Sequence, residues 1–208
     1  MSVPVVIDIY HGDPVVNFAK TKESGILGVI HKASQGGASV DLAYSTRRKL
    51  AKEVGLLWGA YHFFDFSAPA AFQAEHFLSV AAPDDSTLIT LDWENVGNRE
   101  PSAALAREFL QVIEAKLGRK AVLYSGNVAK EQIRGIDEYF ASHRLWLCQY
   151  GAHFVTQESW KNAPWLWQNN GDNLGPGPHH IPGIGGLCDN NCLVGDMTPE
   201  RLVKEWAQ

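Results

Sequence analysis

Apolar residues occur in short runs along the chain, and most early runs are followed by a segment in which apolar positions repeat every three or four residues. Eight runs have the length and composition of strands. They are VPVVIDIY (3–10), ILGVIHKAS (26–34), LLWGAYHFF (56–64), STLITLDWE (86–94), RKAVLYSG (119–126), HRLWLCQY (143–150), APWLWQNN (163–170) and GGLCDNNCLVG (185–195). The helical spacing predicts helices over 42–54, 70–80 and 103–117, and a Thr-Pro pair begins a last helix over 198–206.

The order of these elements favours a β/α barrel. Strands and helices alternate over the first five strands, which is typical of a parallel sheet. After Tyr139 the connections are short and rich in Gly, Pro and Asn, so full crossover helices are not expected there. The sheet could close or stay open, but YHGDP after the first strand is not a nucleotide-binding turn, which favours closure. We predict one catalytic domain over residues 1–208, an irregular eight-stranded barrel with fewer helices than a regular TIM barrel.

Composition excludes some partners. Of the 208 residues, 45% are hydrophobic and 20% are charged, as in ordinary globular proteins, and the net charge is −5. No basic field is available to attract nucleic acid, and no apolar run has the length of a membrane span. The N-terminus MSVPVVIDIY lacks a basic segment, so no export signal is expected. We expect a monomer with no nucleic-acid partner and no membrane partner.

The stretch LITLDWENVG places Asp92 and Glu94 two residues apart at the end of a strand. Side chains alternate along a strand, so both carboxylates project to one face and Trp93 to the other. In a β/α barrel the chemistry gathers at the carboxyl ends of the strands. Asp8 on the first strand and Asp189 on the last occupy corresponding positions, and these strands are neighbours in a closed barrel. The sequence therefore predicts four carboxylates around one mouth.

Crowded carboxylates raise one another's pKa, which can keep one of them protonated as a general acid. Cleavage of a glycosidic bond needs such an acid and a second group that stabilises the reacting carbon. Alternatively, Asp92 and Glu94 only cap the strand or pair with Lys and Arg. A Mg²⁺ or Ca²⁺ site is ranked lower because the EF-hand spacing is absent, and no G-x-S-x-G motif supports a serine hydrolase. No cofactor and no metal are expected.

Aromatic residues near the predicted strand ends favour a sugar ligand, because flat rings can stack on pyranose rings. Some of them must be core residues instead. The aromatic residues in question are Tyr10, Tyr61, Phe63, Tyr124, Trp146, Tyr150 and Trp167.

Several phrases together resemble family 25 glycoside hydrolases, the CH-type lysozymes. They are VVIDIYHG, VIHKASQG, GLLWGAYHFF, LITLDWE, AVLYSG, LWLCQY, LWQ and GLCDNN, in the family's order and approximate spacing. The resemblance covers nearly the whole chain, and GAYHFF together with LDWE is its most specific part. It implies an N-acetylmuramidase that cuts the β-1,4 bond between N-acetylmuramic acid and N-acetylglucosamine in peptidoglycan glycan strands.

Carried over by position, the resemblance makes Glu94 the general acid/base. Asp92 becomes the residue that orients the substrate's own acetamido group, while Asp8 and Asp189 are two further acids of the site. An inverting route, in which Asp92 or another acid activates water, stays open. By the same resemblance Tyr61, Tyr124 and Gln168 line the sugar cleft, to which the aromatic pattern adds Phe63 and Trp146. The site of action would be the cell wall, extracellular or periplasmic, reached by lysis or through a secretion machine.

The chain also departs from the family pattern. Tyr10 and His11 stand where Ser and Gln are common, and Gln35 replaces a usual Glu, which affects expected glycan or stem-peptide preference. Segment 171–186 is a variable loop that could wall one end of the cleft. Cys188 and Cys192 flank Asp189 and are compatible with a disulfide, with free thiols or, less favourably, with zinc. His62 is expected in a barrel hydrogen bond, and His11 at the cleft mouth.

Two rival functions remain. The first is a glycan-binding module on the same fold without turnover, although a pure binder has no need to keep Glu94. The second is a hydrolase of chitin-like polymers, since family 18 enzymes also end a strand in D-x-E. Their longer acidic run is missing, because Thr90 occupies the position of its middle Asp. Comparative digestion of peptidoglycan and chitin separates these readings.

Overall fold

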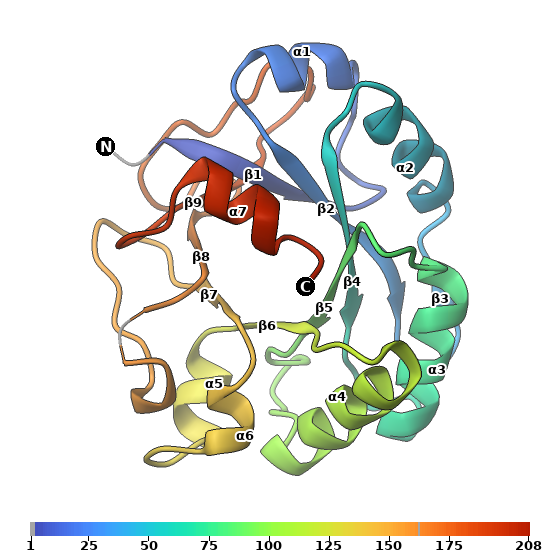
Figure 1. The fold of residues 1–208 in the computed structure, drawn as a ribbon, viewed down its shortest axis with the longest axis vertical. Coiled ribbons are helices and arrows are strands. Elements are labelled where there is room, and N and C mark those ends of the chain that lie inside the picture. The colour runs from blue at the N-terminus through green and yellow to red at the C-terminus, as the bar shows by residue number, and fades with distance from the viewer. Residues whose placement is uncertain (1–2, 162) are drawn as a thin grey trace.

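The chain folds into a closed barrel (Figure 1). In the computed structural model, which describes residues 3–161 and 163–208, eight strands form the barrel wall. They are β1 (Pro4–Ile9), β2 (Gly28–Gln35), β4 (Leu57–Phe63), β5 (Thr87–Asp92), β6 (Val122–Ser125), β7 (Leu145–Cys148), β8 (Leu166–Asn170) and β9 (Asp189–Cys192). β1 pairs with β9 on one side and β2 on the other, so the sheet closes on itself. This confirms the predicted irregular barrel.

The barrel is mixed rather than parallel. β9 runs antiparallel to both β1 and β8, and the two-residue strand β3 (Ser39–Val40) forms an antiparallel pair with β2. The expectation of a wholly parallel sheet is wrong for β9 because no crossover helix returns the chain to the other end of the barrel after β8. The connecting loop stays at the carboxyl end of β8, so Asp189 lies at the mouth as the first residue of its strand.

Helices cover the outside of the first strands, as the alternation predicted. They are α1 (Phe18–Glu23), α2 (Tyr44–Glu53), α3 (Ala70–Ala81), α4 (Ala103–Leu117), α5 (Asn127–Gln132), α6 (Glu138–Ala141) and α7 (Pro199–Glu205), with a 3-10 turn η1 (Glu158–Trp160). The four predicted helices are confirmed to within two residues at each end. In α4, the Ser102 side chain accepts from the Leu105 amide at 3.4 Å, and Gly118 ends the helix with φ of 66°.

Strand alternation divides the apolar core into two layers. Inward residues such as Val6, Ile30 and Leu88 fill the barrel, while the outward residues between them pack under the helices. Helix α7 lies across one end of the barrel in Figure 1. Its Trp206 is 2% exposed and donates from Nε1 to the Trp58 carbonyl at 2.9 Å, near the start of β4. The end at which the parallel strands begin is therefore closed by an apolar plug, which leaves the opposite end for a site.

Within residues 3–161 and 163–208, no helix combines the length and the hydropathy needed to cross a membrane.

Candidate active site

Four carboxylates meet at the end of the barrel opposite α7. Asp92 is the last residue of β5, Glu94 follows two residues later, and Asp8 lies near the end of β1. Asp189 begins β9 and is the Cα partner of Asp8. All four line one cavity of about 290 Å³. The other residues that line it are Tyr10, Lys32, Tyr61, Phe63, Tyr124, Trp146 and Tyr150.

The local fold of the D-W-E stretch follows the period of two. Trp93 points away from the barrel, where its Nε1 donates to the Pro101 carbonyl at 2.8 Å and its ring stacks on Phe140 with centroids 5.6 Å apart. Asp92 on the opposite face has Phe63 and Tyr124 as its Cα partners on the two neighbouring strands. One buried tryptophan thus anchors the strand end that presents both carboxylates.

Asp92 is buried and lacks a full set of partners. It is 6% exposed, and among the described residues no group donates a hydrogen bond to its Oδ1. Burial raises the pKa of Asp92 well above its usual range, and the charge of Glu94 adds to the rise. Burial also raises the pKa of Glu94, and the Lys32 ammonium opposes both rises. The pair is suited to hold one proton and one negative charge at the same time.

Asp8, in contrast, is firmly held. Gln168 Nε2 donates to its two oxygens at 3.0 and 2.9 Å, and Asn191 Nδ2 donates at 2.7 Å. Burial and the nearby Asp189 raise the pKa of Asp8, and these hydrogen bonds oppose the rise. Asp189 accepts the Asp172 amide at 2.8 Å, yet burial raises the pKa of Asp189 to about 6. Asp8 is therefore fixed in place, whereas Asp92 keeps a vacant acceptor.

Four of the five predicted sugar-binding residues line the cavity, and the fifth, Gln168, lies behind its wall. Tyr61, Phe63, Tyr124 and Trp146 line it, although Trp146 is only 2% exposed and packs edge-on against Tyr124. Gln168 lies behind the cavity wall, where it is 1% exposed and accepts the Tyr124 hydroxyl at 2.7 Å. Its contacts make it a support for Asp8 and Tyr124.

Two residues named in the sequence lie away from the cavity. Trp167 packs outside the barrel against Phe154 and donates from Nε1 to the Gln149 carbonyl at 2.8 Å. The expectation that His11 reaches the mouth is not met, because Asp41 holds its ring at 3.0 Å and its backbone amide at 2.8 Å. His62 is a buried barrel residue as predicted, bonded to Ser34 at 2.8 Å and to Gln73 at 3.1 Å.

Sequence reasoning missed Lys32 and Asn191. Lys32 projects into the barrel from β2, donates to Gln35 at 2.7 Å and lies over the Phe63 ring at 5.0 Å from its centroid. Asn191 bridges Asp8 and the Trp146 indole, whose Nε1 donates to it at 2.5 Å. The alternation of Gly28, Ile30 and Lys32 along β2 was the signal that a cation would face the carboxylates.

Comparison with known proteins decides the family. The model of glycosyl hydrolases family 25 matches residues 7–176, which runs from β1 past β8. The chain belongs to glycosyl hydrolases family 25. The prediction of a glycoside hydrolase is thereby confirmed.

Relatives of this family 25 chain include the protein YegX of Escherichia coli. YegX of strain O157:H7 is 30% identical over 189 residues, which cover 88% of this chain and 65% of YegX. YegX of strain K12 is 29% identical over 184 residues, 86% of this chain and 64% of YegX. The chain therefore spans just under two thirds of the length of these relatives. An autolytic lysozyme of Clostridium acetobutylicum is 40% identical over 73 residues, 35% of this chain and 22% of that protein.

Solved structures share the barrel. The bacterial lysozyme from Streptomyces coelicolor superimposes with a TM-score of 0.83 at 22% identity, covering 97% of this chain and 95% of that chain. The muramidase from Trichobolus zukalii superimposes with a TM-score of 0.82 at 25% identity, covering 99% of each chain. The closed barrel with few helices is thus the fold of the family.

Of the three departures from the family pattern, Tyr10 alone lines the cavity among the described residues. Tyr10 is 43% exposed, and Tyr150, which also lines the cavity, is 40% exposed. Gln35 accepts from Lys32, so a neutral amide stands beside that cation. Loop 171–186, all of which the structure describes, contributes no residue to the cavity wall. It packs instead near α1, where Ile184 forms a bridge with Val15.

The cysteines next to Asp189 form no disulfide. The Cys188 thiol faces the Asp189 carbonyl at 3.7 Å, and the Cys192 thiol faces Asn169 Oδ1 at 3.4 Å. Within the part of the chain that the structure describes, no group of three or more His, Cys, Asp or Glu residues is arranged to hold a metal ion.

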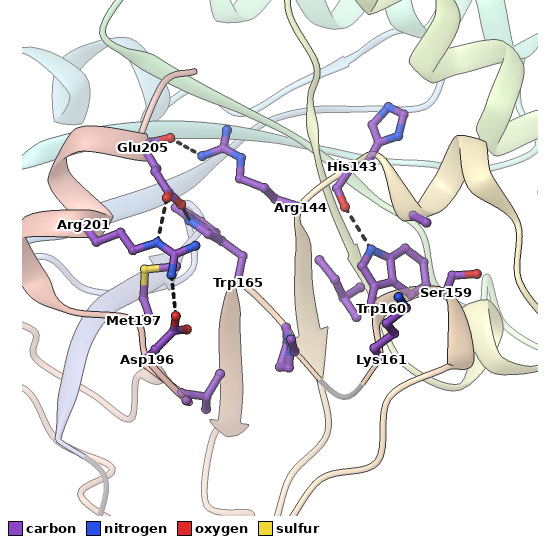
Figure 2. Close-up of a pocket in the computed structure, with 16 residues that line it drawn as sticks. His143, Arg144, Ser159, Trp160, Lys161, Trp165, Asp196, Met197, Arg201 and Glu205 are labelled. Carbon is purple, nitrogen blue, oxygen red and sulfur yellow. Dashed lines mark hydrogen bonds and ion pairs between the residues drawn. The ribbon is translucent and has the colours of Figure 1, made fainter.

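A second cavity, of about 340 Å³, lies at the α7 end of the barrel (Figure 2). One arginine of this cavity pairs with two acids: Arg201 bonds Asp196 at 3.1 Å and Glu205 at 2.7 Å. Trp165 Nε1 also donates to Glu205, at 3.1 Å. This cavity is larger than the carboxylate cavity, but both acids among its described lining residues are paired, so the candidate active site is the carboxylate cavity.

Proposed function

We propose that this family 25 hydrolase cleaves the β-1,4 bond between N-acetylmuramic acid and N-acetylglucosamine in peptidoglycan. One observation carries the proposal: the buried Asp92 Oδ1 has no donor among the described residues and stands beside Glu94, whose pKa burial raises. A buried acceptor without a partner costs free energy, and the amide N–H of a 2-acetamido sugar supplies the missing donor. The lysozyme and muramidase that share the fold support the same substrate class.

The reaction follows from the two carboxyl groups. Glu94 donates its proton to the glycosidic oxygen as the bond from that oxygen to the anomeric carbon breaks. The substrate's acetamido oxygen attacks the anomeric carbon, and Asp92 accepts the acetamido N–H and stabilises the positive charge that develops. Water then attacks the anomeric carbon and breaks its bond to the acetamido oxygen, while Glu94 removes a proton from that water, which restores the enzyme. This is the substrate-assisted variant of glycoside hydrolysis, and it needs no protein nucleophile.

The surrounding groups support that division of roles. The Lys32 ammonium opposes the rise of the pKa of Asp92, which favours the anion that the acetamido group needs. Asp8 and Asp189, on the opposite side of the mouth from β5, supply acceptors for sugar hydroxyl groups. Tyr61, Phe63 and Tyr124 offer the apolar walls against which a pyranose ring packs.

The proposal extends to the wider role. Residues 1–208 act as one catalytic unit whose partner is the glycan strand of the cell wall. The enzyme acts outside the cytoplasm, in the wall, after release by lysis or by a secretion machine.

The test is the structure of the products. Purified peptidoglycan is digested with the protein, and the soluble fragments are reduced with borohydride and identified by mass spectrometry. The proposal expects reduced N-acetylmuramic acid at every new end and no release from chitin. Reduced N-acetylglucosamine at the new ends, or protein that sediments with the wall and releases nothing, would refute it. The second result would favour a glycan-binding module.

A further inference from the structure

A second hollow adjoins the carboxylate cavity on the side of β6 and β7. It has a volume of about 480 Å³ and shares Glu94 and Tyr150 with the carboxylate cavity. Its other lining residues are Asn95, Gly126, Asn127, Val128, Cys148 and Gln149. Glu94 therefore stands between two hollows, with Asp92 lining only the first.

Gln149 presents fixed donors to this hollow. Its Oε1 accepts two hydrogen bonds, from Lys130 Nζ at 2.8 Å and from the Val155 amide at 3.1 Å. These two donors determine which way the carboxamide faces, so the two N–H bonds of Nε2 are left for another acceptor. No described residue accepts from this Nε2. The neighbouring Asn127 is exposed and its side-chain amide is likewise without a described partner. Fixed neutral donors of this kind suit hydroxyl and acetamido oxygens.

The position of Glu94 gives the cleft a direction. This step rests on the proposed function, in which the sugar that is attacked must have its acetamido group at Asp92. That sugar consequently occupies the first cavity, and the sugar that departs with the oxygen protonated by Glu94 must lie beyond Glu94. The hollow beyond Glu94 contains no lysine, arginine or second carboxylate among its described lining residues, which fits a neutral sugar.

We infer that this hollow binds the leaving-group N-acetylglucosamine, and that Gln149 Nε2 donates a hydrogen bond to it. Lys130 acts as a positioning residue, because it holds the Gln149 carboxamide in the orientation that exposes Nε2. The glycan strand then crosses the barrel mouth with its reducing end over β6 and β7.

The experiment uses two defined substrates. One is the tetrasaccharide that alternates N-acetylglucosamine and N-acetylmuramic acid and begins with N-acetylglucosamine. The other is the trisaccharide left when the first sugar has been removed, so that nothing lies on the far side of the attacked sugar. Variants Gln149→Met and Asn127→Ala are compared with wild type, and Gln132→Met on the same helix as Asn127 is the matched control. Asn127 is exposed, so its variant keeps the test valid if Gln149→Met unfolds.

The expected result is a loss of kcat/KM in Gln149→Met of about 3- to 10-fold, the size expected for neutral hydrogen bonds, on both substrates alike. Asn127→Ala should lose activity in the same direction on both substrates, and the pH profile should keep its shape. A loss confined to the tetrasaccharide would overturn the inference, because Gln149 would then serve the opposite side of the cleft. Unchanged rates in both variants, or a shifted pH profile in Gln149→Met, would also overturn it. Failure of wild type on both substrates would instead refute the proposed function.

Discussion

Replacing Lys32 with methionine removes the one positive charge that lines the carboxylate cavity in the described part of the chain. Methionine keeps much of the length of the apolar stem, so the change is mainly electrostatic. An opposite charge within about 4–6 Å lowers a carboxyl pKa by about 1–3 units, and Lys32 is only half-buried and faces Asp92, Asp41, Glu94 and Asp65 together. We therefore expect the lower end of that range, about one unit, for the Asp92 and Glu94 pair.

The sign follows from the roles of the two acids. Without the ammonium, the pKa values of Asp92 and Glu94 both rise further. Asp92 must be ionised and Glu94 protonated for turnover, so both limbs of the bell-shaped pH profile should move to higher pH by about one unit. The assay is the initial rate of fragment release from dilute peptidoglycan across pH at constant ionic strength.

Two controls accompany Lys32→Met. Lys32→Arg keeps the charge and should keep the profile nearer to wild type, and Lys49→Met removes a lysine whose side chain is 79% exposed. A Lys32→Met profile that stays in place or moves to lower pH would refute the electrostatic reasoning.

Two further substitutions test the site. Asp92→Asn should lower kcat by about 100-fold or more, because the charge that supports the acetamido group is lost. The free energy of unfolding of this variant should also increase relative to that of wild type as the pH rises. The pKa of Asp92 is higher in the folded state than in the unfolded state, where it is about 4, so wild type loses stability as the pH rises between these two pKa values. Urea denaturation at several pH values measures the difference in free energy of unfolding between Asp92→Asn and wild type. A difference that shrinks with rising pH would contradict the raised pKa of Asp92. Gln168→Leu should destabilise the fold by about 1–3 kcal/mol, because the buried Tyr124 hydroxyl loses its acceptor and Asp8 loses one of its two side-chain donors. A change below about 0.5 kcal/mol in the same assay would show that Gln168 does not support them.

Much of the site could be predicted because strands obey a period of two. The spacing of Asp92 and Glu94 fixes a shared face on any strand, and Trp93 indeed packs on the opposite side. The eight apolar runs and the long helices could be predicted equally well, because burial of one face sets the spacing of apolar residues along each element. The single-domain organisation over residues 1–208 stays a prediction.

The features that could not be predicted from the sequence depend mainly on contacts between segments that are distant in the chain. The direction of β9 is set by the path of loop 171–186, which has no periodic signal. The short helices α1 and α6 contain six and four residues, too few for a clear period, and their capping residues Asn17 and Asp137 were their main signals. The orientation of the Gln149 carboxamide depends on donors from Lys130 and Val155, and the hydrophobic pattern of the sequence does not indicate either contact.

The most direct test of the central claim is the rate at which Glu94→Gln releases fragments from purified peptidoglycan. Glutamine keeps the size of the side chain but has no proton to donate to the glycosidic oxygen, so general acid catalysis is lost. We expect a fall of about 100-fold or more without loss of stability toward unfolding, while Glu100→Gln on the exposed loop that follows keeps the wild-type rate. Fragment release by Glu94→Gln at the wild-type rate would contradict the assignment of Glu94 as the general acid.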